Sequence, residues 1–265
     1  EGEKMLEIKD LTIQYGENNT VVENFSLNMQ KGEIISIVGE SGSGKSTVLR
    51  SIIGGLLGQG KVISGDIIFN GKSLLNLSNN EWREIRGTVI SMISQDCGAT
   101  LDPIRKIGSQ YIEYIDAHTN LKKNEAEEKA CSMLEKVRLP EVKNIMNSYP
   151  YELSGGMKQR VGIAMALTFK PELVLADEPT SALDVTTQAQ IVKQMMELRD
   201  EFNTGIIIVT HNIGVAAYMA DKIIVMQKGV VVDSGSREEV INNPKSDYTK
   251  KLLKSIPEMD GERFV

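Results

Sequence analysis

A glycine-rich segment between an apolar run and a helical pattern constrains this chain more than any other feature. Residues 39–46 read Gly-Glu-Ser-Gly-Ser-Gly-Lys-Ser and fit the pattern G-x-x-x-x-G-K-[ST]. Glycines permit backbone conformations in which successive N–H groups point at phosphate oxygens. Lys45 is expected to reach the β- and γ-phosphates, and the Ser46 hydroxyl to ligate magnesium. A chance glycine-rich turn is the alternative, but the strand-like residues 34–38 before it and the helix pattern of residues 45–57 after it disfavour that interpretation.

A second apolar run ends in two carboxylates. Residues 173–176 read Leu-Val-Leu-Ala and are followed by Asp177 and Glu178. Carboxylates at the C-terminal edge of a parallel sheet point into the usual ligand crevice. Asp177 suits the coordination sphere of magnesium, and Glu178 is then free to polarise an attacking water. Taken alone, an acidic strand-to-loop turn explains the pair equally well, whereas beside the phosphate loop we prefer the functional interpretation.

The two histidines of the chain have different contexts. His211 follows the strand-like residues 206–209 and is therefore expected at the same sheet edge as the carboxylates. We predict that it contacts the γ-phosphate, although a lone histidine at a strand end is more often structural. His118 has no such context and is interpreted as a surface or structural residue. Asp184 is predicted to cap the helix that follows it, which is compatible with a functional role as well.

Strand and helix patterns alternate along most of the chain. Short apolar runs indicate strands, and the apolar stripe of residues 191–202 indicates a helix. This alternation predicts a largely parallel sheet with helices on both faces, and the helical pattern of residues 96–167 is interpreted as an insertion. Within it, Asn124 and Glu127 are predicted to form a capping box. The predicted strands are residues 6–13, 20–29, 34–38, 64–69, 89–93, 173–176, 206–209 and 223–226.

Composition excludes several classes of protein. The 265 residues carry a formal net charge of -6, which argues against a general nucleic-acid binder. Two distant cysteines and two histidines cannot supply a disulfide framework, a zinc knuckle or a histidine-rich metal site. No apolar run approaches the roughly 18 residues of a membrane span. The first residues also lack the apolar core of a secretory signal. We therefore expect a cytoplasmic chain whose membrane role, if it has one, comes through a partner.

A third motif makes the resemblance to a known family specific. Residues 153–160 read Leu-Ser-Gly-Gly-Met-Lys-Gln-Arg and resemble the signature motif of ABC ATPases. The resemblance implies an α/β fold: a P-loop NTPase core with a mostly parallel sheet, an N-terminal antiparallel β region and an inserted helical subdomain. It implies a single domain over residues 1–265, with the core in 1–95 and 168–265 and the helical subdomain in 96–167. The family's other motifs follow in its order: the P-loop at 39–46, the Q-loop at Gln95, Walker B at 173–178, the D-loop at 181–184 and the switch histidine at His211.

The resemblance narrows to one subgroup. Four segments are similar to the ATPase subunits of oligopeptide, dipeptide and nickel importers: residues 92–110, 149–167, 176–190 and 244–253. Of the two ATPase subunits in such importers, Met157 and residues 163–166 resemble the first. Two departures bear on the cargo. Cys97-Gly-Ala replaces a Pro-containing, bulkier run in a region that resembles the permease contact, which weakens the assignment of the transported substrate. The absence of a long C-terminal extension after residues 252–253 favours a shorter nickel- or metallophore-type member.

The resemblance assigns a role to each matching residue. Tyr15 is expected to stack on the adenine of ATP, although a strand-end aromatic is the alternative. Glu178 is implied to be the general base, with His211 bracing the γ-phosphate and Gln95 contacting magnesium or the water. Magnesium is implied to lie against Ser46, Gln95 and Asp177. The residues implied to bind ATP are Tyr15, Gly39, Ser41, Gly42, Ser43, Gly44, Lys45, Ser46, Thr47, Ser154, Gly155, Gly156 and Asp184.

The resemblance also implies an assembly. In the family the signature Ser154–Gly156 completes the site of the opposite subunit, so a paralogous ATPase subunit is expected in a head-to-tail dimer. Two permease subunits at the cytoplasmic face of the cell membrane, and indirectly a substrate-binding protein, complete the expected importer, with no nucleic acid. The alternative is an ABC ATPase of a soluble enzyme complex, such as phosphonate degradation. ABC proteins of DNA repair or translation usually need tandem cassettes or long coiled coils, which 265 residues do not hold.

Overall fold

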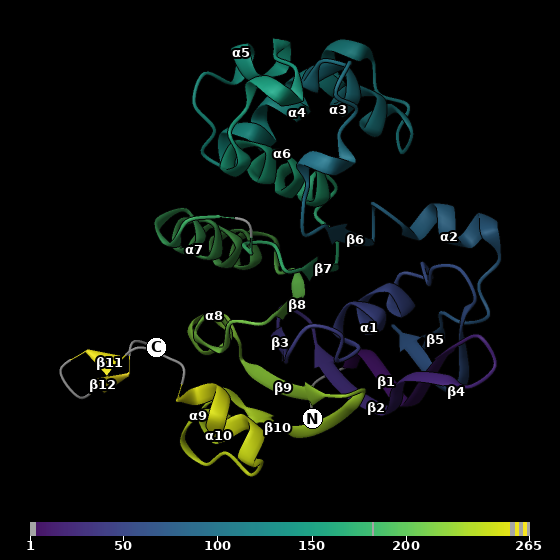
Figure 1. Ribbon diagram of the computed structural model, residues 1–265. Coiled ribbons are helices and arrows are strands. Elements are labelled where there is room, and N and C mark those ends of the chain that lie inside the picture. Colours follow the sequence, from purple (N-terminus) through teal and green to yellow (C-terminus); the bar gives the residue numbers. More distant parts are fainter. Residues whose placement is uncertain (1–3, 182, 255–257, 260–261, 264–265) are drawn as a thin grey trace.

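The computed structural model describes residues 4–181, 183–254, 258–259 and 262–263, in two larger sheets, a short hairpin and surrounding helices (Figure 1). The N-terminal sheet is antiparallel, in the order β2-β1-β4-β5. Its strands are β1 (Lys4–Tyr15), β2 (Asn19–Gln30), β4 (Gly60–Phe69) and β5 (Lys72–Ser73). The hairpin pairs β11 (Glu258–Met259) with β12 (Glu262–Arg263).

The second sheet has six strands in the order β10-β9-β3-β8-β7-β6. The pairs among β9, β3, β8, β7 and β6 are parallel, and only β10 is antiparallel to its neighbour. This arrangement confirms the predicted fold class. The strands are β3 (Ile34–Val38), β6 (Ile90–Ile93), β7 (Leu173–Asp177), β8 (Gly205–Thr210), β9 (Lys222–Gln227) and β10 (Val230–Ser236).

The central strands are buried on both faces, as their continuous apolar sequence predicts. Every residue of β3, β7 and β8 is buried. Because side chains alternate along a strand, Ile34 and Val38 pack in one hydrophobic cluster while Ile35 and Ile37 pack in the other. The second cluster lies between this sheet, the N-terminal sheet and α1 (Lys45–Ile52). The loop between β3 and α1 therefore follows a strand whose two faces are both packed in hydrophobic clusters.

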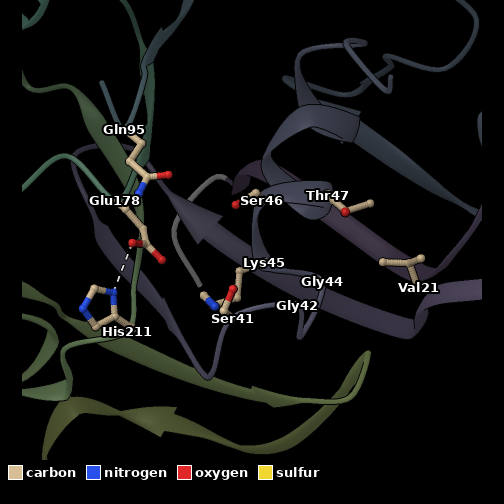
Figure 2. Close-up of a pocket in the computed structure, with 10 residues that line it drawn as sticks. All are labelled: Val21, Ser41, Gly42, Gly44, Lys45, Ser46, Thr47, Gln95, Glu178 and His211. Atoms are coloured by element: carbon tan, nitrogen blue, oxygen red, sulfur yellow. Dashed lines mark hydrogen bonds and ion pairs between the residues drawn. The ribbon is translucent and has the colours of Figure 1, made fainter. Parts of the chain in front are cut away.

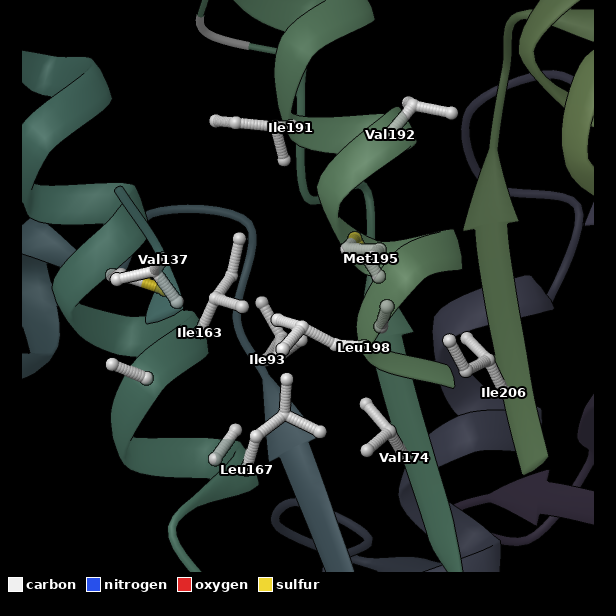
Figure 3. Packing of buried hydrophobic residues seen from close by; sticks show 14 of the residues in the cluster. Ile93, Val137, Ile163, Leu167, Val174, Ile191, Val192, Met195, Leu198 and Ile206 are labelled. Carbon is white, nitrogen blue, oxygen red and sulfur yellow. The ribbon is translucent and has the colours of Figure 1, made fainter. Parts of the chain in front are cut away.

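Helices cover the opposite face of the parallel sheet and extend away from it (Figure 1). Side chains of α6 such as Ile163 and Leu167 belong to the same cluster as Val174 of β7 and Leu198 of α7 (Figure 3). The helical block and the sheet thus share one hydrophobic core. The helical elements between β6 and β7 are η1 (Gly98–Thr100), α3 (Ile107–Asp116), α4 (Lys123–Lys136), α5 (Val142–Asn147), η2 (Pro150–Glu152) and α6 (Gly155–Leu167).

The remaining helices flank the sheet. They are α2 (Asn79–Ile85), α7 (Val185–Phe202), α8 (Ile213–Met219), α9 (Arg237–Asn242) and α10 (Asp247–Leu253). Within the described ranges, no helix is long and apolar enough to cross a membrane.

Two local predictions were wrong. The helix predicted to run to residue 57 ends at Ile52, because Gly54 takes a left-handed φ of 64° and stops it. The capping box predicted at Asn124 and Glu127 is not formed, because the N-cap of this helix is Lys122, whose side chain has no hydrogen-bond acceptor. There the Glu125 carboxylate accepts a hydrogen bond from the Lys122 N–H at 2.8 Å, and Asn124 is already in the first turn.

Candidate functional site

The loop from Gly39 to Gly44 is shaped by glycines. Gly42 and Gly44 have φ values of 79° and 96°, a region that side chains with a Cβ rarely enter. A Cβ on Gly44 would lie 2.7 Å from the Val21 carbonyl oxygen, and one on Gly39 only 2.1 Å from that of Met226. The loop therefore needs glycine both for its turns and for its close approach to β2 and β9.

Lys45 begins α1 and is buried, with 4% of its surface exposed. Its Nζ donates to the Glu40 carbonyl oxygen at 2.7 Å and lies 3.5 Å from Ser43 Oγ. Burial lowers the pKa of Lys45, and the negative charges of Glu178, Asp177 and Glu40 oppose that shift. The ammonium group is thus held in a desolvated position, where it interacts more strongly with an incoming anion than it would in water.

Ser46 and Asp177 meet although 131 residues separate them. The Ser46 hydroxyl, in the first turn of α1, donates to Asp177 Oδ1 at 2.7 Å, and Asp177 is the buried last residue of β7. A hydroxyl and a carboxylate oxygen are hard ligands that suit Mg²⁺. No cluster of three or more His, Cys, Asp or Glu side chains that could hold a metal occurs in the part of the chain that the structure describes. The donor set therefore fits an ion that takes its remaining ligands from phosphate and water, as Mg²⁺ commonly does.

Glu178 stands where β7 leaves the sheet. Its φ of 45° is left-handed, and its N–H donates to the Val209 carbonyl oxygen of β8 at 2.9 Å. This turn directs the carboxylate towards His211, whose Nδ1 lies 3.1 Å from Glu178 Oε2 (Figure 2). The pair lies at the C-terminal edge of the parallel strands, as the sequence predicted.

One open cavity of about 520 Å³ brings most of the predicted residues together (Figure 2). The phosphate loop forms one wall and Glu178 with His211 forms the other. Gln95 reaches it from the segment after β6, and its Nε2 donates to Ser181 Oγ at 3.3 Å. Three predicted residues lie next to the cavity without lining it. Gly39 approaches the Met226 carbonyl oxygen, Ser43 is buried within the loop, and Asp177 accepts the hydrogen bond from Ser46. The lining residues are Val21, Ser41, Gly42, Gly44, Lys45, Ser46, Thr47, Gln95, Glu178 and His211.

The signature residues lie elsewhere. Ser154, Gly155, Gly156 and Asp184 line a separate cavity of about 410 Å³, which shares no residue with the first. Ser154 Oγ caps α6 by accepting from the Met157 N–H at 3.3 Å. Asp184 caps α7, as predicted, because its carboxylate accepts from the Thr187 N–H at 3.0 Å and from the Thr187 hydroxyl at 2.6 Å. These hydrogen bonds lower the pKa of Asp184. The predicted site residues of this chain are thus divided between two separate cavities.

Tyr15 also lies apart from the lining of the first cavity. It is the half-buried last residue of β1, next to the turn that leads into β2. A Cβ on Gly60 would lie 2.8 Å from two atoms of its ring, so β4 packs closely against the tyrosine. His118, interpreted as structural, packs at ring-centroid distances of 5.2 Å from Tyr114 and 5.4 Å from Phe169.

The sequence profile of the ABC transporter family matches residues 22–181, which is more than half of the chain. The chain belongs to the ABC transporter family. The matched segment contains the phosphate loop, Gln95, the signature residues and the acidic pair, whereas Asp184 and His211 lie beyond it. As an ABC transporter ATPase, the chain hydrolyses ATP to power transport.

Named relatives extend the match over nearly the whole chain. The dipeptide transport ATP-binding protein DppD of Lactococcus lactis subsp. cremoris (strain MG1363) is 42% identical over 98% of this chain and 75% of its own length. The oligopeptide transport ATP-binding protein OppD of Escherichia coli (strain K12) is 42% identical over 99% of this chain and 78% of its own.

Solved ABC cassettes share the fold. A dimeric post-hydrolysis state of the ATP-binding cassette MJ0796, bound to ADP and Pi, has a TM-score of 0.77 and 31% identity over 88% of this chain and 99% of that one. The protein cbiO1 from Clostridium perfringens, part of the ABC transporter complex cbiONQ, has a TM-score of 0.78 and 27% identity over 91% of this chain and 92% of its own.

Sequence reasoning missed three residues of this ABC cassette site. Val21 lines the cavity from β2, which no motif marks. Ser181 lies in the recognised D-loop segment, but its contacts with Gln95 and with the Glu178 carbonyl oxygen depend on the fold. Tyr248 belongs to the segment 244–253 that resembles the importer subgroup, but the resemblance did not place it at the loop, where its hydroxyl accepts a hydrogen bond from the Glu40 N–H at 2.9 Å. Only a long-range contact brings it to the loop.

Proposed function

We propose that this chain is the ATPase subunit of an ABC importer whose cargo is a peptide. The observation that carries the proposal is the pair of separate half-sites: the phosphate loop, Glu178 and His211 share one cavity, while Ser154–Gly156 line another. A single chain therefore cannot surround ATP with both sets of residues. A head-to-tail dimer, in which each signature segment faces the phosphate loop of the other subunit, joins the two half-sites.

The phosphate loop is proposed to hold the triphosphate. Ser41, Gly42, Gly44 and the first residues of α1 line the cavity, and backbone N–H groups of such a loop and of a helix N-terminus suit phosphate oxygens. Lys45 exchanges its contact with the Glu40 carbonyl oxygen for the β- and γ-phosphates, and Ser41, Ser46 and Thr47 line the same wall. Tyr15 is proposed to stack on adenine at the end of β1.

Hydrolysis is proposed to start from a water beside Glu178. The carboxylate takes a proton from that water while the water oxygen attacks the γ-phosphorus, and the bond to the β-phosphate oxygen breaks as ADP leaves. His211, 3.1 Å from the Glu178 carboxylate, orients that group and braces the γ-phosphate. Gln95 and Asp177 with Ser46 would hold Mg²⁺, which neutralises charge on the phosphates when bound.

The partners and the cargo rest on the relatives. The named matches are dipeptide and oligopeptide transport ATP-binding proteins, which favours a peptide importer over a nickel importer or a soluble enzyme complex. We propose a paralogous ATPase subunit, two permeases and a substrate-binding protein as partners, at the cytoplasmic face of the membrane.

Reconstitution tests this proposal. ATP hydrolysis is measured for the chain alone, with the paralogous subunit and permeases in vesicles, and after addition of the binding protein loaded with a peptide or with a nickel chelate. We expect weak hydrolysis by the chain alone and a rise at each addition, with the largest rate for the peptide-loaded protein. If the chain alone hydrolysed ATP at the rate of the full assembly, the proposed dependence on these partners would be refuted. Stimulation by nickel chelate and not by peptide would refute the cargo.

A further inference from the structure

The C-terminal helix α10 touches the phosphate loop directly. The hydroxyl of Tyr248 accepts a hydrogen bond from the Glu40 N–H at 2.9 Å, across 208 residues of sequence. Glu40 directly follows the first glycine of the loop. Through this hydrogen bond, α10 supports the phosphate loop, a contact that none of the sequence motifs indicated.

Tyr248 is held firmly enough to act as a support. The buried Asp233 carboxylate of β10 accepts hydrogen bonds from the Lys245 and Ser246 N–H groups at 2.8 and 3.2 Å. Ser246 Oγ in turn accepts from the Tyr248 N–H at 3.1 Å and caps α10. Leu253 of the same helix is buried in the main hydrophobic cluster, and the Tyr248 ring packs against that cluster as well. The segment before α10 and the helix itself are thus fixed to the sheet.

The other side of Glu40 faces the functional lysine. The Glu40 carbonyl oxygen accepts from Lys45 Nζ at 2.7 Å and from the Ser43 N–H at 3.2 Å. Tyr248, Glu40 and Lys45 therefore form a continuous series of contacts from α10 to the cavity. A tyrosine hydroxyl is neutral at physiological pH, and burial raises the pKa of Tyr248 above its ordinary value.

We infer that Tyr248 is a positioning residue, which holds Glu40 so that the phosphate loop and Lys45 are already arranged before nucleotide binds. The inference rests on the proposed function of the loop. Without the hydroxyl, nucleotide binding has to order the loop itself, so affinity falls. The chemical step is affected little, because Tyr248 contacts neither Glu178 nor His211 among the hydrogen bonds of the described residues.

Tyr248→Phe tests the inference, because it removes the hydroxyl and keeps the ring. A typical hydrogen bond contributes about 0.5–1.5 kcal/mol. We therefore expect the Kd for a fluorescent ATP analogue with Mg²⁺ to rise about two- to tenfold, since 1.36 kcal/mol corresponds to a factor of ten. KM in the assembled complex should rise by the same factor, with kcat within about twofold. The matched control is Tyr218→Phe, at a half-exposed tyrosine on α8, which should leave all three values unchanged.

Hydrogen exchange supplies a readout that a general loss of stability would not reproduce. In the parent chain the Glu40 amide should be protected, and Tyr248→Phe should accelerate its exchange while leaving that of β10 unchanged. An unprotected Glu40 amide in the parent, or an unchanged Kd in the variant, overturns the inference. Faster exchange throughout β10 and α10 overturns it as well, because Tyr248 would then be a packing residue. Lys45→Ala in the same titration separates the two proposals: if it also binds normally, the proposed function of the loop fails.

Discussion

The substitution Glu178→Gln separates chemistry from structure at this site. Glutamine keeps the shape of the side chain and can still hydrogen-bond to His211, but it cannot accept a proton from water. Removal of a general base slows a reaction by about 10²–10⁴-fold. At 1.36 kcal/mol for each factor of ten, the barrier to hydrolysis rises by about 2.7–5.4 kcal/mol.

The effect on stability should be much smaller. The partner His211 has 58% of its side chain exposed, and Glu178 has 18%. A polar contact between side chains as exposed as these contributes about 0–1 kcal/mol. Thermal unfolding of the variant should therefore remain close to that of the parent, while turnover nearly disappears. The two magnitudes differ enough to distinguish a lost catalytic group from a damaged fold.

The assay is single-turnover hydrolysis in the assembled complex, with nucleotide affinity measured in parallel. Affinity should be retained, and an ATP-bound dimer should accumulate in light scattering because it no longer hydrolyses its nucleotide. The matched control is Glu172→Gln, immediately before β7 at the other end of the strand, where Glu172 accepts a hydrogen bond from Asn70 at 3.0 Å. Turnover of Glu178→Gln within a few-fold of the parent would refute its assignment as the general base.

Two further predictions concern the signature helix. Ser154→Arg should abolish hydrolysis at the site formed with the partner's phosphate loop, because the arginine side chain fills the second cavity. The ATP affinity of this chain's own phosphate loop, measured by equilibrium titration, should stay unchanged. A loss of that affinity would contradict the separation of the two half-sites. Gly162→Ala should lower the free energy of unfolding in urea by about 1–2 kcal/mol. Overpacking costs about 1–3 kcal/mol, and the higher helix propensity of alanine offsets up to about 1 kcal/mol of that cost. Its Cβ would lie 2.2 Å from Cys97 Sγ, so Cys97→Gly in the same chain should restore part of the loss, and a variant more stable than the parent would refute the packing.

The parts of the site that the sequence predicted are those that local patterns determine. The phosphate loop follows from its glycines, and the placement of Glu178 and His211 follows from two apolar runs that end at one sheet edge. The parallel sheet and the helical insertion follow from the alternation of strand and helix patterns. All of these depend on residues close together in the chain.

The remaining features depend on contacts that no local pattern contains. The early end of α1 at Ile52 is set by the left-handed Gly54, and the predicted apolar pattern to residue 57 did not show it. Val21 reaches the cavity only because β2 passes beside the loop, where its carbonyl oxygen faces Gly44. The C-terminal α9 and α10 were not predicted, since each is only a turn or two long and is held by Asp233 and by packing.

The strand order also determines when this protein can fold during its synthesis. β3 carries the phosphate loop, yet its two neighbours in the sheet are β8 and β9, from the last third of the chain. A ribosome therefore releases the apolar β3 long before either partner strand exists. Pairings over such sequence distances are slow to form and leave apolar strands open to aggregation. A nascent chain that ends after the acidic pair already contains the phosphate loop, the signature segment and both carboxylates, but β3 has no partner in it. We expect such a chain to depend on chaperones until residues 205–227 emerge.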